Sequence, residues 1–291
     1  MPASTSSCTR VERVREARNV LDQHFQALAE EMRHGKSDAL LRYLEFSARF
    51  HQYSFRNLLL ILAQKRDATR VAGFRLWNQM GRHVKPGEKG IMILAPMLVK
   101  KRREPQEPPP PEEDAQAAAL TLFKVVYVFD VSQTDGAALP ALLHTAGDAS
   151  GLYPALQRVV MHAGIALEIV ESVPGSNTAQ GASFGGRIAV RGDLDPADGF
   201  RTLAHELAHE KLHWRGEKES KTVRELEADA TAFVVCRHFG LHPDSADYLL
   251  LYDATPEVLL GRLETVRDTA AEIIAMVEED IGAAVPASDE V

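Results

Sequence analysis

The chain has 291 residues, of which 45% are hydrophobic and 25% charged, and it carries a net charge of −8. Two cysteines, Cys8 and Cys236, do not make a disulfide framework, which excludes a disulfide-rich secreted protein and favours a reducing cytoplasm. The first 20 residues contain no apolar segment of signal-peptide length, and no run approaches 18 apolar residues, so we expect a cytoplasmic protein without membrane spans.

The charge is divided unevenly along the chain. Residues 1–137 contain 21 Lys and Arg against 16 Asp and Glu, whereas residues 138–291 contain 12 against 25. A basic half followed by an acidic half suggests two domains with different tasks. The basic half is a candidate for binding a polyanion.

The basic half is predicted to combine helices with a β-hairpin sheet. Apolar periodicity and turn signals place helices over residues 9–33, 38–50 and 54–64, and strands over 90–100 and 120–130. The two strands should pair with each other. Between them, residues 102–119 are rich in Pro and Glu and are expected to form a disordered insertion. The domain boundary should fall near residues 136–148, which gives domains over 1–137 and 138–291.

The acidic half is predicted to place short strands before long helices. A helix over 153–163 should be followed by strands over 165–171 and 186–190, and then by helices from 196, over 222–238 and over 256–279. Strands followed by helices, without βαβ alternation, indicate an α+β fold.

The most specific motif is His205-Glu206-Leu207-Ala208-His209, an H-E-x-x-H pattern. Asp195 as an N-cap and Pro196 in the first turn independently predict a helix here. Residues four apart share one helix face, so His205 and His209 should bind one Zn²⁺ together. Glu206 is then placed to take a proton from a water molecule that the metal activates, as the catalytic base.

A third metal ligand is expected on the next helix. Glu225 and Asp229 are four residues apart on the face predicted to be buried. We therefore predict Glu225 as the third ligand and Asp229 as the acceptor of a histidine N–H. Glu227 should point away from that face. His213 is a rival ligand, but a straight helix places it too far from the metal, so it is expected at the rim. Cys236 is expected to be a small buried side chain.

This pattern resembles the gluzincin class of metallopeptidases, which combine H-E-x-x-H with E-x-x-x-D on the following helix. The resemblance implies a zincin-like fold for residues 138–291. It also implies that residues 185–190, predicted as a strand, form the edge that pairs with an extended peptide substrate.

Aromatic and cationic residues alternate through residues 53–96. Single-strand binders combine a cationic groove for phosphates with aromatic faces for bases. The alternative is that Phe55, Phe74 and Trp77 are core residues and that the lysines are merely solvated.

The N-terminal half also resembles the N-terminal domain of ArdC-type antirestriction proteins. The match lies in Y-S-F-R-N-L-L-L-I-L from Tyr53, in residues 73–96, and in V-Y-V-F-D-V-S-Q-T-D-G from Val126. It implies single-stranded-DNA binding joined to a zincin-like domain on mobile elements. The candidate nucleic-acid-binding residues are Tyr53, Ser54, Arg56, Asn57, Arg75, Trp77, Arg82, Lys85 and Lys89.

Three functions remain open on the sequence. The first is an antirestriction protein that binds single-stranded DNA, carries a zinc peptidase site and protects incoming mobile-element DNA. The second is a regulatory metalloprotease of the ImmA/IrrE kind that cleaves a DNA-bound repressor, a protein substrate. The third is a non-enzymatic single-stranded-DNA-binding protein with a structural zinc.

Overall fold

The computed structural model describes residues 10–33, 37–100, 119–139, 148–214, 219–242 and 256–284. It has an α+β fold that divides into two compact units. Unit 1 comprises Met1–Ala27 and Arg56–Leu139, and unit 2 comprises Leu28–Phe55 and Pro140–Val291. The expected boundary at 137/138 thus lies two residues from the observed one. The segment Leu28–Phe55, however, belongs to unit 2 and not to the N-terminal unit.

Helices near the N-terminus agree closely with the predicted ranges. They are α1 (Arg10–Arg33), α2 (Ser37–Arg49) and α3 (Phe55–Gln64). In unit 1 the core contains Ala17 of α1, Leu60 of α3 and Leu94, with Val20, Leu21 and Val125 packed against them.

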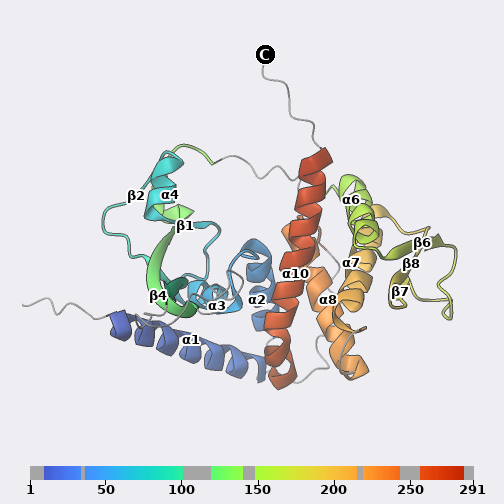
Figure 1. Cartoon of the computed structure of the whole chain (residues 1–291), viewed down its shortest axis with the longest axis horizontal. Coiled ribbons are helices and arrows are strands. Elements are labelled where there is room, and N and C mark those ends of the chain that lie inside the picture. Colours follow the sequence, from blue (N-terminus) through green and yellow to red (C-terminus); the bar gives the residue numbers. More distant parts are fainter. Residues whose placement is uncertain are drawn as a thin grey trace, which may run out of the picture. The chain divides into compact units, whose positions relative to one another are not determined.

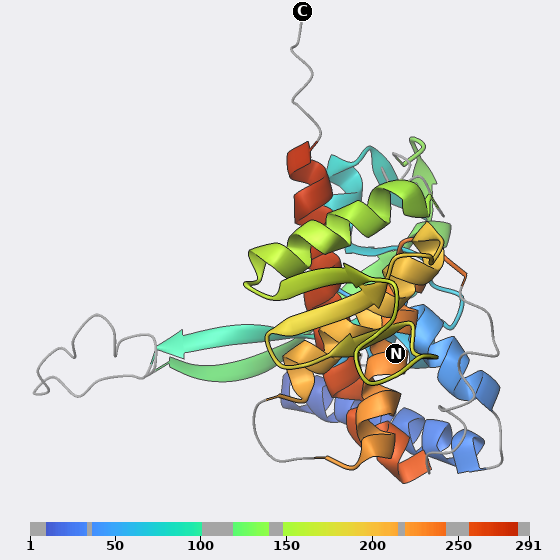
Figure 2. The same ribbon diagram turned by 90° about the vertical axis from the view of Figure 1, so that its right-hand side faces the viewer.

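The predicted hairpin of unit 1 is confirmed. Strand β3 (Ile91–Lys100) pairs antiparallel with β4 (Ala119–Asp130), from Ile91 opposite Val128 to Lys100 opposite Ala119. Figure 2 shows these strands as a long two-stranded ribbon. The predicted insertion lies outside the described residues, except for Ala119, which begins β4.

Four short elements of unit 1 had no counterpart in the sequence prediction. Strand β1 (Val71–Gly73) pairs with β4, helix α4 (Phe74–Gln79) follows it, and strand β2 (Arg82–Val84) pairs with β5 (Thr134–Gly136). Gly136 is required for this last pairing. Its φ is +139°, and a Cβ there would stand 2.3 Å from the carbonyl oxygen of Gly81.

The C-terminal part of unit 2 combines four helices with a small mixed sheet that lies on one side of them (Figure 1). The helices are α6 (Ala149–His162), α7 (Pro196–Leu212), α8 (Lys221–His238) and α10 (Pro256–Ala284), and they run beside one another (Figure 1). Strand β8 (Arg187–Arg191) pairs parallel with β6 (Ala166–Val170) and antiparallel with β7 (Gly181–Ser183), in the order β6-β8-β7.

Helix α8 is the central helix of unit 2. It packs against α7, α10 and α2, and every residue from Leu226 to Cys236 is buried. As expected, Cys236 is a buried free thiol. Among the helices of the described residues, none combines the length and apolarity that a membrane span requires.

Candidate metal centre

Helix α7 begins as its sequence predicts. The Asp195 carboxylate accepts hydrogen bonds from the backbone N–H groups of Ala197 and Asp198 at 2.9 and 3.0 Å, and Pro196 occupies the first turn. His205 and His209 therefore lie one turn apart on the face of α7 that meets α8. Their ring centroids are 4.7 Å apart.

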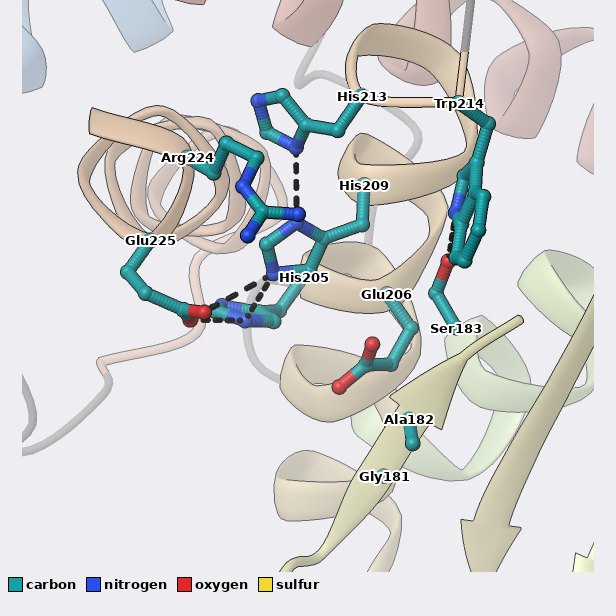
Figure 3. A pocket seen from close by; sticks show the side chains of 10 residues that line it. All are labelled: Gly181, Ala182, Ser183, His205, Glu206, His209, His213, Trp214, Arg224 and Glu225. Atoms are coloured by element: carbon teal, nitrogen blue, oxygen red, sulfur yellow. Dashed lines mark hydrogen bonds and ion pairs between the residues drawn. The ribbon is translucent and has the colours of Figure 1, made fainter. Parts of the chain in front are cut away.

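Three donor atoms converge between α7 and α8. The Nε2 atoms of His205 and His209 are 3.0 Å apart, and Oε2 of Glu225 lies 3.5 Å from the first and 3.6 Å from the second. Figure 3 shows the three side chains pointing toward one another. Ligands about 2.0–2.1 Å from a tetrahedral metal stand roughly 3.3 Å apart. Two imidazoles and a carboxylate at these separations fit one divalent ion.

His205 is oriented by the residue predicted for that task. Its Nδ1 lies 2.8 Å from Oδ1 of Asp229, so the N–H points at the carboxylate and Nε2 is left for a metal. Burial lowers the pKa of His205, but hydrogen bonds to Asp229 and Glu225 outweigh it and raise the pKa to about 10. A metal that binds here displaces that proton.

His209 is oriented through His213 and Glu227, two residues that were not predicted to support a ligand. Its Nδ1 lies 2.8 Å from Nδ1 of His213, and Nε2 of His213 lies 2.9 Å from Oε2 of Glu227. If His209 keeps Nε2 for the metal, its Nδ1–H donates to His213, and the Nε2–H of His213 donates to Glu227. Arg262 lies 3.5 Å from the other oxygen of Glu227.

The burial of His213 and Glu227 and their contact with each other were not predicted from the sequence. Both side chains are only 3% exposed. His213 is the C-cap of α7, lines the pocket and contacts Glu227 of α8. Glu227 is buried because α8 has packing partners on several sides, so a position off the metal-facing side still lies inside the unit.

Glu206 lies beside the donor triad and contributes no donor to it. Its side chain comes from α7 on the side of β7 (Figure 3). Burial raises the pKa of the Glu206 carboxyl, and the neighbouring His205 and His209 oppose that shift. A raised carboxyl pKa suits a general base that works near neutral pH.

The triad and Glu206 line a pocket of about 360 Å³. The remaining lining residues are Gly181, Ala182, Ser183, His213, Trp214 and Arg224. The Trp214 indole N–H donates to Oγ of Ser183 at 2.6 Å, and Ser183 donates to Glu210 of α7 at 2.7 Å. These bonds fix β7 against the helix that carries the histidines.

The strand at the pocket is β7, not the predicted edge strand over residues 185–190. That segment contains β8, which has a partner on each side and no free edge. Hydrogen bonds from Arg191 N–H to the Gln180 carbonyl and from Phe184 N–H to the Arg187 carbonyl set the pairing of β7 with β8. By alternation, the N–H and C=O groups of Gly181 and Ser183 point outward from the sheet.

Known proteins share the fold and part of the sequence. A family model for the N-terminal domain of anti-restriction factor ArdC matches residues 18–129. Two crystal structures of the antirestriction protein ArdC from the R388 plasmid cover 92% of this chain at 18% identity. The metal-free one has a TM-score of 0.52 over 98% of its length, and the Mn(II)-bound one 0.53 over 99%.

Residues 18–129 thus match the N-terminal domain of ArdC, and the chain shares the ArdC fold. A further relative is the uncharacterized protein pXO2-81 of Bacillus anthracis, which is 23% identical over 83% of this chain and 48% of its own length. The chain therefore spans about half the length of this curated relative.

The candidate nucleic-acid-binding residues are divided between the units. Tyr53 and Ser54 belong to unit 2, and the others belong to unit 1. In unit 1 the side chains of Arg56, Arg75 and Lys89 are exposed. Lys85 is half-buried and donates to the Ser132 carbonyl at 3.0 Å.

Three of these candidates have structural contacts within unit 1. Trp77 is 2% exposed and donates its indole N–H to the Phe129 carbonyl at 2.8 Å, so it presents no open face to a base. The Asn57 side chain bonds both the N–H and the C=O of Leu94. Arg82 bonds Oγ1 and the carbonyl of Thr134, which joins β2 to β5.

Other aromatic side chains of unit 1 are exposed. Phe74 is 53% exposed, Tyr127 44% and Phe123 39%. Phe123 and Tyr127 are four residues apart in β4 and therefore share one face of the strand. Sequence patterns alone did not separate these exposed rings from the buried indole of Trp77.

Proposed function

We propose that the chain is an antirestriction protein that binds single-stranded DNA through unit 1 and hydrolyses a peptide bond at a zinc site in unit 2. The observation that carries the proposal is the donor triad of His205, His209 and Glu225, with Glu206 beside it at a pocket bordered by β7, the outer strand of its sheet in the described part of the chain. The proposal places unit 2 among the zincin-like metallopeptidases.

Each functional residue of the pocket has a separate role in the proposed hydrolysis. His205, His209 and Glu225 would hold Zn²⁺, which would supply a Lewis acid for polarising a carbonyl group and acidifying water. Glu206 accepts a proton from the attacking water and returns it to the leaving amine. An extended substrate pairs with the outward N–H and C=O groups of Gly181 and Ser183, which aligns its scissile bond with Glu206.

The nucleic-acid part of the proposal rests on exposed rings and cations of unit 1. Phe74, Phe123 and Tyr127 are exposed aromatic side chains, and Arg75 and Lys89 are exposed in the same unit. Base stacking on such rings contributes about 1–3 kcal/mol per base and tolerates any sequence. ArdC of the R388 plasmid is named an antirestriction protein, which supports the same task here.

The peptidase arm is tested with Glu206→Gln. The zinc-loaded wild type and variant are incubated with a random peptide library and with host proteins, and new termini are read by mass spectrometry. Cleavage should fall at least 100-fold in Glu206→Gln while zinc content stays at the wild-type level, because Glu206 moves the proton and does not hold the metal. Glu171→Gln, an exposed carboxylate of the same unit, is the matched control.

The DNA arm is tested by fluorescence anisotropy with a single-stranded oligonucleotide and its duplex across a salt series. Phe74→Ala and Tyr127→Ala should each weaken single-strand binding about 5- to 100-fold. Met161→Ala, an equally exposed side chain of unit 2, should leave it unchanged. Absence of single-strand binding at low salt rejects the DNA arm.

Protection of unmodified plasmid DNA in a restricting host separates the competing functions. Protection that needs both Glu206 and the exposed rings supports the full proposal. Protection that survives Glu206→Gln points to a non-enzymatic DNA-binding protein with a structural metal. Cleavage of one repressor, without any protection, points to a regulatory metalloprotease of the ImmA/IrrE kind.

A further inference from the structure

A second group of metal-binding side chains lies within unit 2. His51 follows the end of α2, His238 is the last residue of α8, and Glu278 belongs to α10. Their donor atoms all lie within 4.8 Å of one another. Glu225 precedes His238 by 13 positions, which corresponds to about 20 Å along α8, so this group is separate from the pocket.

The carboxylate of Glu278 faces both imidazoles. Its Oε1 lies 3.0 Å from Nε2 of His238, and its Oε2 lies 4.0 Å from Nε2 of His51. The two rings are nearly perpendicular, at 77°, with centroids 4.5 Å apart. Two nitrogens and a carboxylate thus surround one point, with each carboxylate oxygen directed to a different ring.

The orientation of the His238 ring is typical of a metal-binding histidine. Its Nδ1 lies 3.0 Å from the carbonyl oxygen of Ala48, so the Nδ1–H donates to the backbone. This bond leaves Nε2 for the side of Glu278. Ligand histidines in proteins are commonly oriented by such an N–H to a backbone carbonyl.

His51 supplies an independent reason to expect a ligand. Its side chain is 10% exposed, and its Nε2 faces Glu278 at 4.0 Å, which is too long for a hydrogen bond. An ion pair between His238 and Glu278 needs no second imidazole beside it. Buried polar groups normally have partners, and a bound cation would bring the His51 ring into a defined interaction.

We propose that His51, His238 and Glu278 form a second, structural metal site for a divalent cation of the zinc class. Imidazole and carboxylate ligands suit Zn²⁺, and water completes the coordination. The 3.0 Å separation already matches neighbouring ligands, and the 4.0 Å separation closes to about 3.3 Å with a small rotation of the half-exposed carboxylate. Arg267, which donates to the His51 carbonyl at 3.3 Å, opposes the cation, and the Glu278 charge offsets it.

The proposed site joins parts of unit 2 that are distant in the sequence. His51 lies in the segment Leu28–Phe55, whereas His238 and Glu278 lie in the C-terminal part of the chain. A metal held by all three fastens this early segment to α8 and α10. The proposal is independent of any peptidase or DNA-binding activity.

Metal content of the full chain tests the proposal. The protein is loaded with Zn²⁺, passed through a desalting column, and measured by mass spectrometry of the metal. Wild type should hold two equivalents and His205→Gln/His209→Gln one. Adding His51→Gln or Glu278→Gln to that double variant should weaken the remaining zinc binding at least tenfold. His162→Gln, an exposed histidine of the same unit, should change nothing.

X-ray absorption of the zinc-loaded His205→Gln/His209→Gln variant identifies the ligands without disturbing the second site. The expected spectrum contains two imidazole ligands and oxygen. If this folded variant binds no zinc, or if its zinc lacks two imidazoles, the proposal is overturned. The measurement remains decisive even where substitution of His51 or Glu278 prevents folding.

Discussion

The buried pair His213 and Glu227 extends the support of the metal centre beyond its three donors. The Nδ1 of His209 contacts the ring of His213, which connects it to the carboxylate of Glu227. Outer partners of this kind typically change metal affinity 10- to 100-fold. The two histidines of H-E-x-x-H are thus supported differently, one by Asp229 directly and one by a relay.

We predict that His213→Phe lowers zinc affinity about 10- to 100-fold. Phenylalanine keeps the ring volume but accepts no hydrogen bond, so His209 loses its orientation, and Glu227 loses a donor while keeping Arg262. Zinc dissociation constants from competition with a chelator measure the effect. His162→Phe, at an exposed position, serves as the control, and equal affinities for both variants would contradict the relay.

The place of some site residues in the structure could be predicted from the sequence, and the place of others could not. The i, i+4 spacing of His205 with His209 and of Glu225 with Asp229 sets their faces locally, and the structure brings all four together. The relay depends instead on how the end of α7 meets α8, which no local pattern encodes. Trp77 shows the same limit, because burial against Phe129 follows from tertiary packing.

At the scale of elements, the turn after β4 depends on one carboxylate. Oδ1 of Asp130 accepts from the N–H groups of Thr69 at 2.7 Å and Arg70 at 3.1 Å, and its Oδ2 accepts from Ser132. Gln133 closes the capping box by accepting from the Asp130 N–H. Burial opposes the charge of Asp130, but these hydrogen bonds outweigh it and lower the pKa of the carboxyl.

We predict that Asp130→Asn destabilises the protein by about 1–3 kcal/mol at pH 7, because the amide cannot accept every one of these bonds. The folded-state pKa is depressed. The stabilisation by Asp130 is therefore complete above the unfolded pKa of about 3.9, and it is lost as the pH falls through the folded value. Urea unfolding at several pH values measures both effects. Asp135→Asn, at an exposed position, should cost less than about 0.5 kcal/mol, and a matching loss there would refute the role of Asp130.

Long elements were predictable and short ones were not. The helices and the β3–β4 hairpin have enough residues to show a period, whereas β1, β2, β5 and β7 have three residues each. Three residues cannot establish an alternation, and their pairing comes from distant partners such as Asp130 opposite Val71. The omission of β7 misplaced the strand edge at the pocket, since β8 carried the stronger apolar pattern.

At the scale of the whole molecule, unit 2 takes one of its parts from early in the sequence. Tyr43 and Leu44 of α2 are fully buried, and α2 packs against α8 within this unit. Helical periodicity predicted α2 but not its partner. The periodicity of an amphipathic helix shows which face is buried, but it does not show which other element covers that face. A division of the chain at residue 138 therefore removes part of the core that supports Glu225 and Asp229.

We predict that residues 138–291 alone do not form a stable metal-binding unit, whereas residues 28–55 joined to them by a flexible linker do. Burial of a large apolar side chain contributes about 1.5–3 kcal/mol, so loss of Tyr43, Leu44 and Phe46 removes as much as the net stability of a typical domain, about 5–15 kcal/mol. Thermal unfolding followed by circular dichroism, with and without Zn²⁺, compares the two fragments. A linked fragment in which Tyr43 and Leu44 are both replaced by Ser controls for the added length. Should the 138–291 fragment melt cooperatively within about 5 °C of the linked one, the segment Leu28–Phe55 would be an accessory to unit 2 and not a part of its core.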